Sequence, residues 1–260
     1  MERKPAEDAL GSAKRLAESF GFERVDPTGK AAKVRAVFDS VASRYDLMND
    51  LMSLGVHRLW KNALVDWLYP RPGIRLLDLA AGTGDIAERV LKRVDGAGSV
   101  ISSDINPSML GHGRDRALDK GWVGEIDVVC ADAMALPFPD RSFDAVTIAF
   151  GIRNVTHIDQ ALAEARRVLV PGGRFLCLEF SKVVLPVLDR LYDTYSFNVL
   201  PNLGRLVAGD AESYRYLAES IRRFPDQADF AQLLEEAGLE QVRYRNLSAG
   251  IAAIHSGWRL

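Results

Sequence analysis

The 260-residue sequence has few cysteines, almost no net charge and no long apolar run. Its two cysteines, Cys130 and Cys177, are too few for a disulfide framework, and each falls within a predicted strand. We therefore expect both to be core thiols of a protein from a reducing compartment. The formal net charge of −2 argues against a polyanion-binding surface, so nucleic acid is not an expected partner.

The uncharged apolar runs are far shorter than the roughly 18 residues that a membrane span requires. The first thirty residues contain no apolar signal-peptide core, and acidic residues such as Glu7 and Asp8 are unusual in a mitochondrial transit peptide. These absences predict a cytoplasmic location.

The length predicts one domain, or one domain with a substantial insertion. Residues 1–30 are expected to form a mobile or loosely docked arm, in which Asp26-Pro27-Thr28-Gly29 breaks a short amphipathic helix. Residues 31–70 are predicted to be a helical lid, and residues 71–260 the main domain. An amphipathic helical insertion is expected at about residues 182–225.

Apolar strand patterns alternate with helical patterns from residue 74 onward. The predicted strands cover residues 74–80, 98–104, 126–132, 143–150 and 173–181, and two more at the end are joined near residues 248–250. Such alternation predicts an α/β protein of Rossmann-like fold, with a seven-stranded, mostly parallel sheet and helices on both faces.

The segment Gly82-x-Gly84-x-x-Ala87 follows the first of these strands and opens a helix. It matches the dinucleotide fingerprint, and Asp104 lies 20 residues beyond Gly84, where a ribose-binding carboxylate is expected. An NAD-dependent oxidoreductase therefore stays open as an alternative.

Charge favours a different cofactor. A diphosphate would be repelled by Asp85 at the helix N-terminus and by Asp78 in the strand. The same carboxylates suit S-adenosylmethionine, which has an ammonium and a sulfonium but no phosphate. The alternative for Asp85 is a helix cap.

Three acidic residues end three consecutive predicted strands, at the sheet edge where ligands bind in open α/β folds. Asp78 lies in an otherwise apolar strand and needs partners, for which the glycine-loop amides are the expected donors. Asp132 is placed to accept from an adenine amine, or else it is a turn residue. Together with Asp104 they predict the cofactor site.

Four motifs resemble those of class I S-adenosylmethionine-dependent methyltransferases: LLDLAAGTGD, SSDINPSML, ADAMALPFPDRSFDAV and RVLVPGGRF. More narrowly, four stretches resemble the ubiquinone/menaquinone biosynthesis C-methyltransferases, the UbiE/MenG group: VFDSVASRYDLMNDLMSLGVHRLWK, FGIRNV, GGRFLCLEFSK and YRYLAESIRRFP. The resemblance covers nearly the whole chain from about residue 30 onward.

The resemblance implies methylation of a ring carbon on a polyprenylated benzoquinol or demethylmenaquinol. It also implies that Thr83, Asp104, Asp132 and Ala133 contact S-adenosylmethionine, beside the glycines of the loop. Family members often have a serine where this chain has Ala149, so a hydroxyl contact is missing here. Two alternatives stay open: methylation of another small molecule such as a sterol or phenolic metabolite, and a non-catalytic subunit of a lipid-synthesis complex.

Arg153 and Asn154 are the predicted catalytic residues, because they follow the fourth strand at the ligand-binding edge. A guanidinium cannot act as a base at neutral pH, but it can stabilise a developing phenolate or orient a water. Asn154 can donate to the same oxygen or hold Arg153. The alternatives are a structural bridge from Arg153 to Asp159, and His157 as the base rather than an exposed or capping residue.

The substrate pocket and the partners are predicted from the lid and the insertion. No metal site is predicted, and the candidate pocket walls, each with core packing as the alternative, are Tyr45, Asn49, Tyr192 and Tyr195. A polyprenyl tail is insoluble, so the insertion is expected to face a membrane surface or a lipid-synthesis complex. Docking on the core and a homodimer face are the other uses. Peripheral binding to the inner face of the membrane is therefore the alternative to a purely cytoplasmic location.

Overall fold

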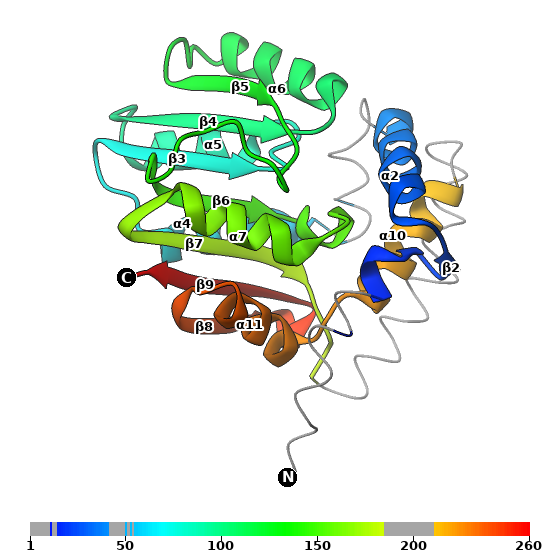
Figure 1. The fold of residues 1–260 in the computed structure, drawn as a ribbon. Helices are drawn as coiled ribbons and strands as arrows, with labels where there is room; N and C mark the ends of the chain where they lie inside the picture. Colours follow the sequence, from blue (N-terminus) through cyan, green and yellow to red (C-terminus); the bar gives the residue numbers. More distant parts are fainter. Residues whose placement is uncertain (1–10, 12–14, 42–49, 51–52, 54, 185–210) are drawn as a thin grey trace.

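A seven-stranded sheet is the centre of the molecule (Figure 1). The computed structural model describes residues 11, 15–41, 50, 53, 55–184 and 211–260. The strand order is β5-β4-β3-β6-β7-β9-β8. The strands are β3 (Ile74–Leu79), β4 (Gly98–Asp104), β5 (Ile126–Cys130), β6 (Phe143–Ala149), β7 (Leu169–Phe180), β8 (Glu240–Leu247) and β9 (Ala252–Arg259).

Strands β3 to β7 pair in parallel, whereas β9 lies between β7 and β8 and is antiparallel to both. The predicted Rossmann-like, mostly parallel sheet of seven strands is confirmed. The last two strands, β8 and β9, form an antiparallel hairpin. The short 3₁₀ turn η4 (Ser248–Gly250) joins them where the sequence predicted.

Helices cover both faces of the sheet, as predicted. On one face, α4 (His57–Leu68) and α5 (Asp85–Arg93) bury Leu64 and Leu91 against Leu76 and Leu176. On the other face lie α7 (Ile158–Val168) and α11 (Gln227–Glu236), while α6 (Pro107–Asp119) packs along β4 and β5. Each helix is amphipathic, so its apolar side packs on the sheet and its charged side faces solvent.

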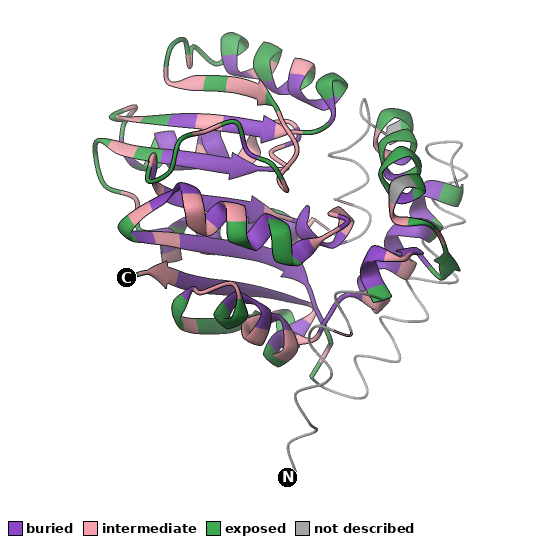
Figure 2. Cartoon of the chain, viewed as in Figure 1, coloured by how far each residue is buried: buried purple, intermediate pink, exposed green. Residues whose placement is uncertain are grey.

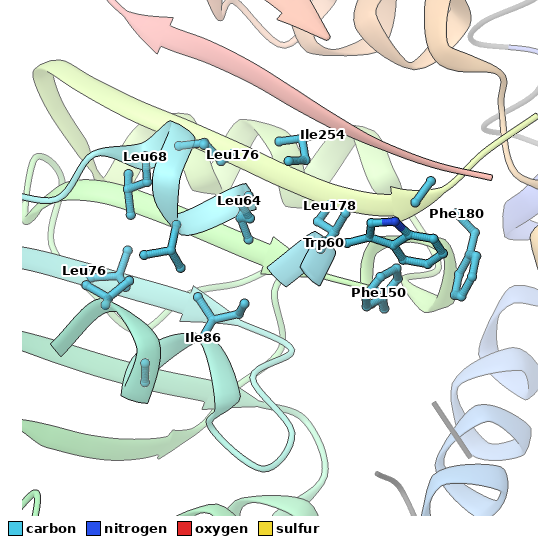
Figure 3. Close-up of a cluster of buried hydrophobic side chains, with 14 of the residues drawn as sticks. Trp60, Leu64, Leu68, Leu76, Ile86, Phe150, Leu176, Leu178, Phe180 and Ile254 are labelled. Atoms are coloured by element: carbon cyan, nitrogen blue, oxygen red, sulfur yellow. The ribbon is translucent and has the colours of Figure 1, made fainter. Parts of the chain in front are cut away.

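The first of these faces extends to the ligand-binding edge of the sheet. Figure 3 shows Trp60 of α4 beside Phe150 and Phe180, with ring centroids 6.3 and 5.9 Å away. Leu178 and Ile254 continue the cluster across β7 and β9. This packing fixes the ends of β6 and β7, from which the residues of the site project.

Two helices lie outside the sheet, beyond the carboxyl ends of its parallel strands (Figure 1). These are α2 (Pro27–Val41) and α10 (Ala211–Arg223), joined to the short hairpin of β1 (Ser19–Phe20) and β2 (Glu23–Arg24). Phe20 stacks on Tyr216 of α10 at 4.1 Å. Figure 2 shows that much of α2 is exposed, in contrast to the buried central strands. The outer layer is therefore held by a few specific contacts.

Polar contacts attach α2 to the sheet edge. Asn106 donates through Nδ2 to Asp39 Oδ1 at 2.7 Å. The buried Lys30 ammonium donates to the carbonyls of Leu16 at 2.7 Å and Val155 at 3.3 Å. Burial lowers the pKa of Lys30 to about 8, and the two carbonyls partly replace its lost hydration.

The N-terminal part differs from the expected arm and lid. Pro27 begins α2 instead of breaking a helix, since proline is favoured in the first turn. Leu16 is buried in the core cluster of α7 and α11, so this part of the arm is packed. Helix α4 lies on the sheet, and α2 alone of the helices described in 31–70 lies over the edge. The division into arm, lid and main domain stays a prediction.

Two further expectations concern the strands. Cys177 is buried as predicted, but the prediction of a buried Cys130 is wrong, because β5 is an edge strand and the thiol is exposed. Pro171 and the two glycines that follow lie within β7, which begins at Leu169 directly after α7. Among the described residues, no helix has the length and apolar character needed to cross a membrane.

Candidate functional site

A pocket opens at the carboxyl edge of the parallel strands, between the sheet and α2. Its walls are mostly apolar, and its polar groups come from the strand ends. The residues that line it include Val34, Arg35, Phe38, Leu79, Ala80, Gly82, Asp104, Asn106, Met109, Asp132, Ala133, Phe150, Gly151 and Asn154. Four lining residues, Ala31, Val34, Arg35 and Phe38, come from α2, so this helix contributes directly to the pocket.

Left-handed backbone marks the strand ends beside this pocket. Ala80 after β3 has φ 48°, and Phe150 after β6 has φ 59°, both uncommon for residues with a side chain. Gly151 is required where these ends meet, because a Cβ on it would lie 2.5 Å from the Ala80 Cβ. Such strained positions persist where the surrounding structure holds them, often at ligand sites.

The glycine loop turns from β3 into α5. Gly82 and Gly84 have φ 55° and 74°, and these positive values explain why glycine stands at both positions. Gly113 of α6 lies so close that an added Cβ would meet the Gly82 carbonyl oxygen at 3.0 Å. Thr83 lines two smaller pockets beside the loop. The loop is thus packed closely against α6.

Asp104 is the carboxylate that binds the glycine loop. Its Oδ2 accepts from the Gly82 amide and its Oδ1 from the Asn106 amide, both at 2.9 Å. Burial raises the pKa of Asp104, and these amides oppose the rise. Since a carboxylate has about four lone-pair sites, Asp104 can still accept hydroxyl groups from a ligand.

The expected partners of Asp78 were wrong. Its Oδ1 accepts from the Thr147 hydroxyl of β6 at 2.7 Å, not from the glycine loop. Its Oδ2 is buried and has no hydrogen-bond partner in the part of the chain that the structure describes. Burial raises the pKa of Asp78 to about 7, against the Thr147 hydrogen bond and the charge of Lys61.

Asp85 is surrounded by cations, which corrects the charge argument against a diphosphate. Lys61 lies 2.8 Å away, Arg89 3.1 Å and Arg116 3.7 Å. Burial alone would raise the pKa of Asp85, but these cations, Lys61 foremost, hold it well below its usual range. The helix terminus is therefore not a net negative site, and Asp85 is no argument against phosphate.

Asp132 and Ala133 both lie in the pocket, as the resemblance implied. The Asp132 Oδ1 also accepts from the Met134 amide at 2.9 Å, so the turn interpretation is correct as well. The turn leaves the second carboxylate oxygen as the acceptor for a ligand. The two interpretations of Asp132 are compatible.

Arg153 lies in a buried ion pair that was not predicted. Its Nη1 donates to Glu179 Oε1 and to the Phe150 carbonyl, each at 2.7 Å, and only 3% of its side chain is exposed. Asp159 is not the partner. Burial raises the pKa of Glu179, with the Arg153 charge opposing. The Arg153 Nε is buried and lacks an acceptor among the described residues.

Asn154, the next residue on the turn η2 (Ile152–Asn154), lines the pocket. Its Oδ1 accepts from the Tyr216 hydroxyl of α10 at 2.9 Å. Burial raises the pKa of Tyr216, so the phenol stays protonated and remains the donor. The hydrogen bond thereby leaves the Asn154 Nδ2 as the side chain's donor toward a ligand.

Sequence reasoning missed four residues of this site: Lys61, Thr147, Glu179 and Tyr216. Glu179 had a recognisable signal, since it is a carboxylate inside an apolar strand, as Asp78 is. The predicted pocket residues Tyr45, Asn49, Tyr192 and Tyr195 lie outside the described residues. His157 precedes α7 and makes no side-chain cap.

A model of the ubiE/COQ5 methyltransferase family matches residues 27–259. The chain is 57% identical over 262 residues to "Ubiquinone/menaquinone biosynthesis C-methyltransferase UbiE" of Brucella abortus (strain S19), covering 100% of this chain and 97% of that relative. A relative of the same name in Brucella anthropi is 57% identical over 255 residues, covering 97% of each chain.

Solved structures of lower identity share the fold. A SAM-dependent methyltransferase from Aquifex aeolicus has a TM-score of 0.61 at 16% identity, covering 82% of this chain and 97% of that one. The phosphoethanolamine N-methyltransferase 2 of Haemonchus contortus, in complex with phosphomonomethylethanolamine and S-adenosylhomocysteine, has a TM-score of 0.58 at 14% identity, covering 77% and 52%.

Proposed function

Because the chain belongs to the ubiE/COQ5 methyltransferase family, we propose that it methylates a ring carbon of a polyprenylated benzoquinol or demethylmenaquinol. It is an S-adenosylmethionine-dependent C-methyltransferase of quinone biosynthesis. The observation that carries the proposal is the 57% identity to UbiE along the whole chain. The pocket at the expected sheet edge supports it.

The residues present fit S-adenosylmethionine, which supplies an electrophilic methyl group when bound. Asp104 has lone pairs left for ribose hydroxyls, and Asp132 has an oxygen for the adenine amine. The buried, unpartnered oxygen of Asp78 suits the ammonium group. We assign the cofactor site to these three, with Gly82, Thr83, Gly84 and Ala133.

On the substrate side, we assign catalysis to Arg153 and Asn154. A quinol carbon becomes nucleophilic when the neighbouring hydroxyl loses its proton and charge enters the ring. The Asn154 Nδ2 can donate to that oxygen from the pocket wall. Arg153 does not itself line the pocket, but its buried Nε lacks an acceptor among the described residues, which an oriented water would supply.

The partners follow from the chemistry of the substrate. A polyprenyl tail partitions into lipid, so we infer that the enzyme meets its substrate at a membrane surface, alone or within a lipid-synthesis complex. Co-sedimentation with vesicles that contain long-tail or short-tail quinone tests this. No binding to vesicles of any of these kinds, with or without quinone, would contradict it.

Methyl transfer from labelled S-adenosylmethionine to two reduced short-tail acceptors tests the reaction. One acceptor is a demethylated naphthoquinol and the other a methoxy-benzoquinol. We expect product on at least one ring, and the preferred ring identifies the substrate. Cofactor binding without methylation of either ring would refute the quinol substrate and direct the search to other small molecules.

The same assay tests the two catalytic residues. Loss of a donor to a developing oxyanion reduces turnover by about 10²-fold or more. We therefore expect the turnover of Arg153→Ala and that of Asn154→Ala each to be lower than the wild-type value by that factor. Tyr216→Phe removes only the hydroxyl that orients Asn154 and keeps the amide, so its turnover should fall less than that of Asn154→Ala. Wild-type turnover in Arg153→Ala would reduce Arg153 to a structural bridge.

A further inference from the structure

Arg35 is a cation of the pocket for which the described part of the chain provides no partner. It lies on α2 among the lining residues, and its guanidinium makes no hydrogen bond or ion pair with any described residue. The other two basic residues of this helix are engaged, since Lys30 donates to two carbonyls and Lys33 pairs with Glu23 at 2.6 Å. A guanidinium has five N–H donors and no acceptor, so Arg35 can donate to oxygen atoms of a ligand.

The contacts at the two ends of α2 place Arg35 over the middle of the pocket. Near the start of the helix, Lys30 Nζ lies 3.3 Å from the carbonyl oxygen of Val155, directly after η2. Near its end, Asp39 accepts from Asn106, just beyond β4. Arg35 lies between these contacts, about 7.5 Å from Lys30 along the helix axis at 1.5 Å per residue. It therefore lies opposite the space between η2 and the end of β4, beyond the carboxyl ends of the strands (Figure 1).

The cofactor offers Arg35 no anion at this place. The cofactor groups assigned to Asp104 and Asp132 are hydroxyls and an amine, which need acceptors rather than a cation. The sulfonium is itself a cation and repels a guanidinium. The carboxylate of the methionine portion shares a carbon with the ammonium, and Asp78, to which the ammonium is assigned, lines a smaller pocket and not this one. The methyl acceptor is therefore the ligand that can meet Arg35.

We propose that Arg35 donates to the second oxygen of the quinol ring, para to the hydroxyl that Asn154 contacts. A 1,4-quinol carries its two oxygens at opposite ends of the ring, and the two donors lie on opposite walls of the pocket, α2 and the sheet edge. Phe38 and Phe150 belong to the same two walls, so the flat apolar ring packs between them. The inference rests on the proposed quinol substrate, and it makes Arg35 a specificity-determining residue that selects rings with two hydroxyls.

The test combines two acceptors with two forms of the enzyme. One acceptor is the short-tail quinol that wild type methylates better. The other is the matching ring that keeps the reactive hydroxyl but lacks the one para to it, a 1-naphthol for the demethylated naphthoquinol or a methoxyphenol for the methoxy-benzoquinol. The two rings differ in intrinsic reactivity, so the informative quantity is the ratio of their kcat/KM values within each enzyme.

This ratio should fall about tenfold from wild type to Arg35→Met, as expected for loss of a hydrogen bond from a charged donor, and it should fall less in Arg35→Lys. Where the analogue is not methylated, its inhibition constant against the quinol replaces kcat/KM. In that case Arg35→Met should raise the KM of the quinol and leave the inhibition constant of the analogue unchanged.

Lys33→Met is the matched control, because Lys33 is an exposed cation of the same helix that does not line the pocket. It should keep the wild-type ratio. Arg35→Met should bind S-adenosylhomocysteine with the wild-type Kd in a calorimetric titration. An unchanged ratio, or a loss of S-adenosylhomocysteine affinity that accounts for the lower turnover, would overturn the inference and leave the quinol substrate intact. Absence of quinol methylation by wild type would refute the proposed function, and this inference with it.

Discussion

Replacing Asp78 by asparagine should make the protein more stable at neutral pH while weakening its cofactor site. The native carboxyl titrates near pH 7, whereas the unfolded value is 3.8. Between these values the native state holds a proton that the unfolded chain has lost, so wild-type stability falls as pH rises. The full penalty, above pH 7, is about 4 kcal/mol at 1.36 kcal/mol per pKa unit.

Asparagine keeps the acceptor for the Thr147 hydroxyl and removes the charge, so it resembles the protonated carboxyl. We expect the stability advantage of Asp78→Asn to grow by about 3 kcal/mol between pH 5 and pH 8. Urea unfolding at both pH values measures it. Affinity for S-adenosylhomocysteine should fall in the variant and should lose the wild-type rise with pH.

The reasoning would be refuted by a variant that is less stable than wild type at pH 8. That result would mean that the carboxylate is ionised and well paired in the native state. An advantage that does not change with pH would point to packing rather than to charge. Thr147→Val provides a comparison, since loss of its hydroxyl should raise the pKa of Asp78 further and leave the site equally shaped.

Three other changes have definite expected outcomes. Glu179→Ala leaves Arg153 buried without its counter-ion and should cost about 3–5 kcal/mol in urea unfolding, whereas replacing both by Met and Leu should cost less. Gly113→Ala crowds the glycine-loop carbonyl and should weaken S-adenosylhomocysteine binding about tenfold, a shift of about 1.4 kcal/mol, while Gly111→Ala on the same helix, with open space around it, should not. Burial lowers the pKa of His255 to about 4, so this imidazole alone should destabilise the native state by about 3 kcal/mol as pH falls from 6.5 to 4, measured as the change in the stability difference between wild type and His255→Phe.

Strand positions and their acidic ends could be predicted because they depend on local pattern. An apolar run followed by a turn specifies a parallel strand, and its carboxyl end specifies the ligand edge. Asp104 and Asp132 lie in the pocket for this reason, whereas the place of Ala133 was implied only by the family resemblance. The i,i+4 contact of Arg89 with Asp85 is of the same local kind.

Partners could not be predicted where they depend on sheet order. Arg153 is followed in sequence by Asp159, but its counter-ion Glu179 is brought near because β6 and β7 are neighbours. Cys130 lies in an apolar segment that is typical of a core strand, but β5 is at the edge of the sheet, and this position exposes the thiol.

The charge argument correctly favoured S-adenosylmethionine over a diphosphate, but one of its two premises was wrong. It counted Asp85 as negative, whereas Lys61, from a helix 24 residues earlier, is its closest cation. Of the two carboxylates invoked, only Asp78 has a buried oxygen, Oδ2, without a hydrogen-bond partner among the described residues.

The position of helix α2 should depend on how much cofactor is bound. The pocket has one wall on the sheet and one on α2, which Asn106 attaches through one hydrogen bond and Lys30 through two. A ligand that touches both walls favours the docked helix by RT ln(1 + [L]/Kd), about 2.7 kcal/mol at one hundred times Kd. In a cell depleted of methyl donor, this helix would be the first part of the site to be exposed to proteases, and the sheet behind it the last.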